Sequence, residues 1–84
     1  MSAADRLRQK MQRTKDGWNA DDLRKLYEGF GFECREGGKH RICIHAAFRD
    51  IRTTIIRDGK VPAGYIQKAL KHLDEVENRE RLAP

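Results

Sequence analysis

The segment FECREGGKHRICIH, from Phe32 to His45, decides how this chain folds. Apolar residues alternate with polar ones on both sides of two adjacent glycines, with Phe32 and Cys34 before them and Ile42 and Ile44 after them. Alternation at every second residue is typical of strands, and adjacent glycines are typical of the turn that joins two strands. The segment is therefore predicted to form a β-hairpin.

The length of the turn decides which side chains share a face. A loop of about three residues, GGK, would put Phe32 and Cys34 on one face together with Ile44 and Ile42. A two-residue GG turn would instead set the isoleucines beside the charged residues of the first strand. Because a shift of one residue sends every side chain to the opposite face, the apolar pattern favours the longer loop.

Helices are predicted before the hairpin. Ser2 and Asp5 form a capping box for a short, charged N-terminal helix within residues 1–16, and Asn19 caps a second helix. Apolar residues of the second helix recur at helical spacing and form one buried face: Leu23, Leu26, Tyr27 and Phe30.

A third strand and a last helix are predicted after the hairpin. IRTTII, residues 51–56, is β-branched enough to be a strand. Pro62 is suited to lie at or just before a helix start. The apolar stripe of that helix is Ile66, Ala69, Leu70, Leu73 and Val76. Residues 79–84 lack periodicity, so we expect them to form a frayed tail.

The order of elements is helix, helix, three antiparallel strands and helix. It predicts a single α+β domain over residues 1–84, with the helices on one face of a small sheet and the other face open. At 84 residues the chain is near the lower end of what folds without a metal or disulfides. No segment approaches the ~20 apolar residues of a membrane span, and the N-terminus lacks the apolar core of a secretory signal. We therefore expect a cytoplasmic protein without membrane contact, with Cys34 and Cys43 reduced and buried rather than paired.

The net charge of +5 is concentrated in the middle of the chain. Residues 35–60 contain seven basic residues against three acidic ones. A basic segment favours a polyanionic partner, most commonly nucleic acid. A solvated basic surface that binds nothing is an equal alternative at this point, because many small domains are basic.

Potential metal ligands crowd into twelve residues with the spacing C-x₅-H-x₂-C-x-H, namely Cys34, His40, Cys43 and His45. Structural zinc sites usually draw on paired knuckles such as C-x₂-C. On the favoured register Cys34 faces the core while Cys43 and His45 face away, so the four side chains would not converge. We expect no metal and no other cofactor.

The hairpin tip fits phosphate chemistry better. Gly37 and Gly38 bring backbone N–H groups close to a ligand, and Lys39 with its neighbours Arg35 and Arg41 supplies positive charge. A histidine such as His40 can exchange a proton near neutral pH. In RNA, such a histidine could remove the 2′-hydroxyl proton and let that oxygen attack the next phosphate, with cations stabilising the phosphorane. The alternative is that His40 is an ordinary exposed turn residue.

The run LRKLYEGFGFECREGGKHRICIH resembles the HicA family of mRNA interferase toxins from bacterial type II toxin–antitoxin modules. GFGFE matches the family's entry into its first strand, and GGKHRICIH matches its turn and second strand, with Lys39 in place of the usual small residue. TTIIRDGKVPAGYIQKALKHL resembles the third strand, loop and closing helix. The similarity covers about residues 4 to 76, and the additional N-terminal helix is also seen in one branch of the family.

The resemblance implies a double-stranded-RNA-binding-domain-like α-β-β-β-α sandwich and metal-independent cleavage of mRNA. His40 corresponds to the catalytic histidine, and a HicB-like antitoxin is the implied partner. Asp58 stands where many members carry a second histidine. With the basic segment, this gives a predicted substrate-binding set of Gly37, Gly38, Lys39, Arg41, Arg35, Arg52 and Arg57. The alternatives are a non-catalytic RNA-binding module that uses the same basic sheet face, and a small domain that docks an acidic partner.

Overall fold

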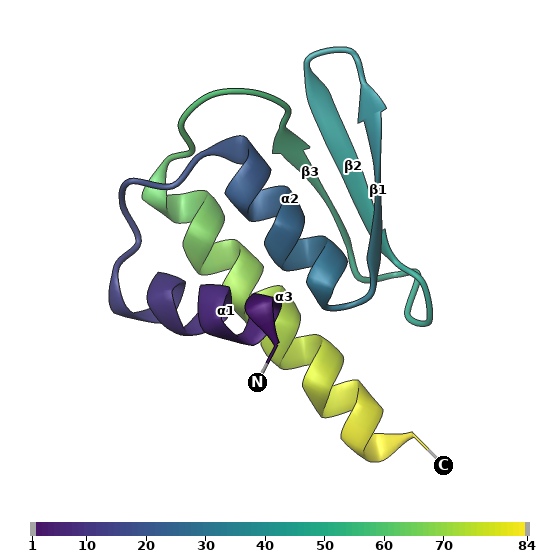
Figure 1. Ribbon diagram of the computed structural model, residues 1–84. Coiled ribbons are helices and arrows are strands. Elements are labelled where there is room, and N and C mark those ends of the chain that lie inside the picture. Colours follow the sequence, from purple (N-terminus) through teal and green to yellow (C-terminus); the bar gives the residue numbers. More distant parts are fainter. Residues whose placement is uncertain (1, 84) are drawn as a thin grey trace.

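The computed structural model describes residues 2–83 and contains three helices and three strands in that part of the chain (Figure 1). Their order matches the predicted one. The elements are α1 (Ala3–Arg13), α2 (Ala20–Gly29), β1 (Phe32–Gly37), β2 (His40–His45), β3 (Arg52–Ile56) and α3 (Ala63–Leu82). The predicted α+β organisation, with two N-terminal helices, an antiparallel sheet and a closing helix, is therefore confirmed.

Local sequence signals fix where the helices begin. In α1 the Ser2 hydroxyl accepts the N–H of Asp5 while the Asp5 carboxylate accepts the N–H of Ser2, and Asn19 and Asp22 form the same reciprocal pair at α2. These capping boxes satisfy N–H groups that the helix itself cannot pair. Pro62 directly precedes α3, as predicted.

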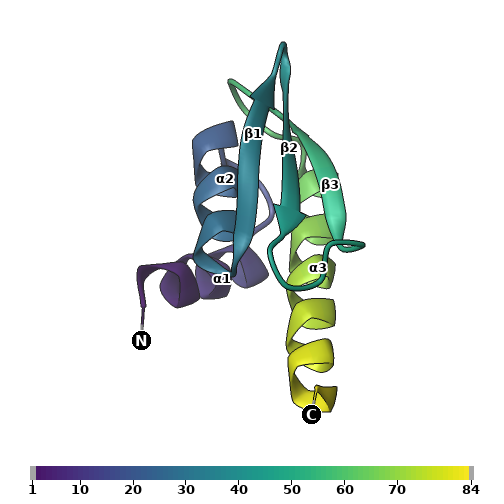
Figure 2. The same cartoon turned by 90° about the vertical axis from the view of Figure 1, so that its right-hand side faces the viewer.

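The helices lie on one face of the sheet, whose strand order is β1-β2-β3 (Figure 2). Figure 2 shows the opposite face turned toward the viewer, without a helix over it. The core between sheet and helices contains the predicted apolar faces of α2 and α3 together with residues from every other element. Its most completely buried large side chains include Tyr27, Met11, Leu23, Leu26, Ile55, Ile66, Leu73 and Val76.

The turn of the hairpin is shorter than predicted. Gly37 pairs with His40, so the loop consists of Gly38 and Lys39 alone. Gly38 has a φ of +67°, whereas no residue other than glycine has a positive φ among residues 2–83. A positive φ at the first central residue followed by a negative one is the pattern of type II′ turns, which strongly favour glycine first and match the twist of paired strands. The glycine that makes the turn is therefore Gly38.

This register reverses the predicted faces of β2. Arg41, Cys43 and His45 point toward the helices, while Ile42 and Ile44 lie on the open face. The preference for the longer loop was wrong because it assumed that the isoleucines must be buried. Polar groups are tolerated inside when they are paired or hydrogen-bonded, and each inward residue of β2 has such a partner.

Cys34 and Cys43 form a disulfide, so the expectation of two reduced cysteines is also corrected. The pair lies directly opposite in the β1–β2 ladder, with Cα atoms 4.0 Å apart. Directly opposed side chains share one face of a sheet and have neighbouring Cβ atoms. The expectation followed from the predicted cytoplasmic location, where disulfides are rare, and it took no account of how the two strands pair.

The last helix is longer than predicted. Residues 79–82 continue α3 instead of fraying, and Pro84 lies outside the described residues. The Arg79 guanidinium pairs with Asp50 at 2.6 Å and with Glu75 at 2.9 Å, which ties this part of α3 to the loop between β2 and β3. No helix within residues 2–83 has the length and apolar character needed to cross a membrane.

Candidate active site

His40 is exposed at the first position of β2, beside the hairpin tip. The β1–β2 hairpin projects past the helices, so its tip is open to solvent (Figures 1 and 2). His40 pairs with Gly37 in β1 and with Ile56 in β3, on the face turned away from the helices. The Lys39 carbonyl accepts the N–H of Arg57 at 3.1 Å, which links the turn to the end of β3. The tip is therefore an anchored turn that presents one imidazole.

Along β2 from His40 toward Ile44, the open face is a mixed basic and apolar surface. Arg35, Ile42 and Thr54 form one cross-strand row, and Glu33, Ile44 and Arg52 form the next. Between them is a hollow of about 240 Å³, lined by Glu33, Arg35, Ile42, Ile44, Arg49 and Arg52. Two of the predicted binding residues, Arg35 and Arg52, thus lie on the same face as His40.

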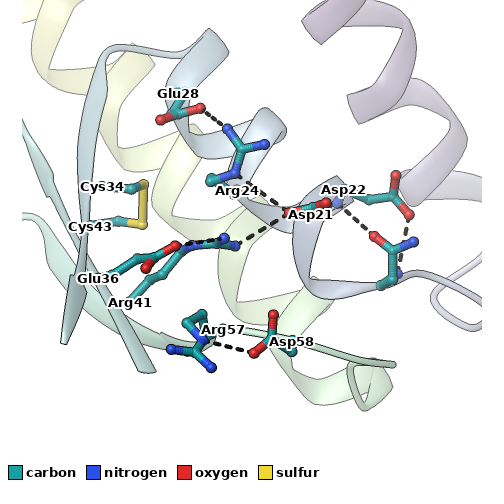
Figure 3. Close-up of polar contacts among 11 residues, drawn as sticks. Asp21, Asp22, Arg24, Glu28, Cys34, Glu36, Arg41, Cys43, Arg57 and Asp58 are labelled. Carbon is teal, nitrogen blue, oxygen red and sulfur yellow. Dashed lines mark hydrogen bonds and ion pairs between the residues drawn. A yellow bond between two sulfur atoms is a disulfide. The ribbon is translucent and has the colours of Figure 1, made fainter. Parts of the chain in front are cut away.

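Arg41 lies on the other side of the sheet (Figure 3). It is only 9% exposed, and its guanidinium lies 3.5 Å from the Asp21 carboxylate of α2 and 3.4 Å from the Glu36 carboxylate of β1. Figure 3 shows the Asp21 contact bridging the hairpin to α2, while the Glu36 contact lies within the hairpin. The structure therefore separates Arg41 from Arg35 and Arg52, and its visible partners are carboxylates of its own chain.

Arg57 is also engaged within the chain. Its Nε lies 2.7 Å from the Asp58 carboxylate (Figure 3), and this hydrogen bond raises the pKa of the guanidinium. Arg57 follows β3 directly and is half-buried. The predicted substrate-binding residues therefore fall into three groups. Arg35 and Arg52 lie on the open face, Gly37, Gly38 and Lys39 lie at the turn, and Arg41 and Arg57 have partners within the chain.

His45 is a buried structural residue at the far end of β2 and is 5% exposed. Its Nδ1 accepts the N–H groups of Ala47 and Phe48, each at 3.1 Å, and its Nε2 donates to the Phe30 carbonyl at 3.1 Å. These bonds occupy both ring nitrogens of a neutral imidazole. His45 thus fixes the chain where it leaves β2.

The four residues considered as metal ligands do not converge on one site. Cys34 and Cys43 are bonded to each other, both nitrogens of His45 are occupied, and His40 lies on the opposite face. No three His, Cys, Asp or Glu side chains within residues 2–83 form a group that could hold a metal ion.

Sequence reasoning missed four residues of the open-face hollow: Glu33, Ile42, Ile44 and Arg49. The isoleucines were assigned to the core by the wrong register. Arg49 belongs to the loop after β2, where no periodicity relates sequence position to a face of the sheet. The sequence signal that could have located the isoleucines is a two-residue turn of Gly38 and Lys39, because this turn puts Ile42 and Ile44 on the open face.

Comparison of the chain with models of known protein families, with curated proteins and with solved structures finds no match.

Proposed function

We propose that this chain is a metal-independent endoribonuclease, the HicA-like toxin of a type II toxin–antitoxin module, and that His40 is its catalytic residue. The observation that carries the proposal is the exposure of His40 on an uncovered sheet face that it shares with Arg35 and Arg52. The resemblance of the sequence to HicA toxins, and an element order compatible with a double-stranded-RNA-binding-domain-like sandwich, support it further.

In the proposed reaction His40 acts as general base. It takes the proton of a ribose 2′-hydroxyl, the 2′ oxygen forms a bond to the adjacent phosphorus, and the bond from phosphorus to the 5′ oxygen breaks. The departing 5′ oxygen takes up a proton from solvent water, the His40 imidazolium returns its proton to solvent, and the products are a 2′,3′-cyclic phosphate and a 5′-hydroxyl. Lys39, which is exposed and precedes His40 in the chain, and Arg35, which lies on the same face of the sheet, would stabilise the charge that builds on the phosphate oxygens.

An RNA-cleaving protein needs an inhibitor in its own cell, and we propose a HicB-like antitoxin for this role. An inhibitor that covers the open face would exclude RNA from His40. Acidic groups of such a partner could pair with Arg35 and Arg52, because charge complementarity speeds association and fixes the register of docking.

A non-catalytic RNA-binding module is the second candidate. The cluster of arginines on the open face favours it, since a binding surface needs cations but no imidazole. Cleavage by the purified chain separates the two candidates.

The test is RNA cleavage by purified wild-type protein and by His40→Ala, both in excess chelator. We expect wild-type cleavage with 2′,3′-cyclic phosphate ends, and a loss of ~10²–10⁴-fold in rate for the variant. The substitution should change stability by less than about 0.5 kcal/mol because His40 is exposed. Lys25→Ala, at an exposed position of α2, is the matched control. Equal rates for wild type and His40→Ala, or 5′-phosphate products, would contradict the mechanism.

A further inference from the structure

The floor of the open-face hollow is apolar although it faces solvent. Ile42 is 40% exposed and is one of two large apolar side chains exposed among residues 2–83, and the half-buried Ile44 lies next to it along β2. A flat nucleobase can cover such a floor with its ring face, because apolar contact depends on the area that is buried and every base has a flat face. The floor thus provides a surface for a base without selecting its sequence.

The walls of the hollow are cationic. Arg35 lies directly opposite Ile42, Arg52 lies opposite Ile44, and Arg49 reaches the hollow from the loop between β2 and β3. These three arginines have no ion-pair partner within residues 2–83, in contrast to Arg8, Arg24, Arg41, Arg57 and Arg79. Guanidinium groups bind phosphates through two parallel hydrogen bonds.

The carboxylate of Glu33 makes the two sides of the hollow electrostatically different. Glu33 lies opposite Ile44 on the side of β1, away from Arg52 on the side of β3. It would repel a phosphate, but it could accept a hydrogen bond from the exocyclic amino group of a base. A nucleotide therefore fits with a phosphate toward Arg52 on the β3 side and the edge of its base toward Glu33 on the β1 side.

The hollow lies in line with the hairpin tip. His40, Ile42 and Ile44 are alternate residues of one strand on one face, so Ile42 is about 7 Å from His40 along the strand. A nucleotide over Ile42 would bring a neighbouring phosphodiester to His40.

We infer that the hollow formed by Glu33, Arg35, Ile42, Ile44, Arg49 and Arg52 is a subsite for an unpaired RNA nucleotide next to the phosphodiester presented to His40. The inference rests on the proposed function and names its substrate as single-stranded RNA. A base reaches an apolar floor only when it is free of a duplex, since A-form RNA offers proteins mainly its phosphates and 2′-hydroxyls. An acidic peptide could pair with the arginines but would not need the apolar floor.

Binding can be measured without cleavage by using 2′-O-methyl oligonucleotides, in which no free 2′-hydroxyl is available to attack. A single strand and a hairpin duplex of the same length are titrated against wild-type protein and against Ile42→Ala. We expect Ile42→Ala to weaken single-strand binding by about fivefold, because apolar contact is lost, and to leave duplex binding unchanged. Leu82→Ala, which removes the other exposed large apolar side chain, is the matched control and should change neither.

The cationic walls are tested by salt dependence. Arg52→Gln should reduce the slope of log affinity against log salt by about 0.7 for the single strand, the value for one phosphate contact. Arg13→Gln, at an exposed position of α1, should leave the slope unchanged. Single-strand titration followed by NMR should also shift the methyl signals of Ile42 and Ile44 more than those of the buried Ile55 and Ile66.

The outcomes separate the inference from the proposed function. If Ile42→Ala and Arg52→Gln bind the single strand like wild type while cleavage still depends on His40, the subsite is wrong and the ribonuclease assignment stands. If wild-type protein neither binds nor cleaves RNA, both are wrong. Binding of an acidic peptide that Ile42→Ala leaves unchanged, without RNA binding, would overturn both in favour of a protein-docking surface.

Discussion

At the scale of single residues, polar side chains inside the molecule are held by specific partners. The buried Tyr27 hydroxyl lies 2.8 Å from Nδ1 of His72 on α3, and burial raises the pKa of Tyr27. Burial, and next the positive charge of Lys68, lower the pKa of His72, although Glu75 acts in the opposite direction. Both shifts keep the pair neutral at pH 7, so the hydroxyl donates to the imidazole.

The His72 shift predicts a loss of stability in mild acid. The unfolded chain takes up a proton at His72 near pH 6.5, whereas the folded chain does so only at lower pH. The unfolded state therefore binds more protons in this window, and the free energy of unfolding falls as the pH drops below about 6.5 and until folded His72 is also protonated. Urea unfolding from pH 8 to pH 5 should show this slope in wild type.

His72→Gln removes this titration but keeps an acceptor for the Tyr27 hydroxyl, so it should flatten the slope. His40→Gln, at an exposed histidine, is the control and should keep it. Identical pH dependence for wild type and His72→Gln would show that another group is responsible.

At the scale of elements, the β1–β2 hairpin combines a turn, a disulfide and an inward arginine. Gly38 sets the two-residue turn, the Cys34–Cys43 bond joins opposed positions, and Arg41 connects the hairpin to α2 through Asp21. All three features act on the same register, which puts His40 on the open face. These three features therefore hold the hairpin in the register that exposes His40, the proposed catalytic residue.

The disulfide should contribute measurably to stability. It links residues nine positions apart, and closing a loop of about ten residues is worth about 2–3 kcal/mol in the chain-entropy description. We expect a reductant to lower the free energy of unfolding by this amount in urea titrations, with thiols counted before and after. The double variant Cys34→Ala/Cys43→Ala should be as unstable as reduced wild type or slightly less stable, and insensitive to reductant. Free thiols in the untreated protein, with no effect of reductant, would refute the bond.

The elements differ in how far sequence predicts them. Capping residues and apolar periodicity located α1, α2 and the core of α3, because those signals act within a few residues of one another. The hairpin register and the last turns of α3 depend instead on tertiary partners: Arg41 on Asp21, Cys43 on Cys34, and Arg79 on Asp50. Hydrophobic patterns hold no information on such partners. The sequence grouped Arg35, Lys39 and Arg41 near His40 because they are close along the chain. Which of them shares a face with His40 depends on the register, which puts Arg35 on the open face and Arg41 on the other side of the sheet.

At the scale of the whole molecule, α1 joins the two ends of the chain. The Arg8 guanidinium contacts Asp74 at 2.6 Å and Glu77 at 2.8 Å on α3, and it lies over the Phe30 ring at 5.4 Å from the centroid. The close approach of α1 to α2 requires glycine at position 29, because a Cβ there would collide with Ala4. Helix α1 is thus packed into the molecule on the side away from the open sheet face, and it leaves that face free.

Removing the Arg8 contacts should loosen α1. The Arg8 side chain is 13% exposed, but both carboxylates are largely exposed and its buried Nε has no hydrogen-bond partner within residues 2–83, so the ion pairs are screened and only partly compensated. We expect Arg8→Ala to lower the free energy of unfolding by about 1–2 kcal/mol, much of it through lost packing of the side-chain stem on Phe30. Arg8→Met keeps that stem and should recover the packing part, while Arg6→Ala, exposed on the same helix, should cost less than about 0.5 kcal/mol.

Because α1 does not contribute to the open face, cleavage of RNA by Arg8→Ala below its unfolding transition should match wild type. A variant that keeps full stability would mean that Arg8 does not hold α1 to α3, and a stable variant that loses cleavage would mean that α1 takes part in binding RNA.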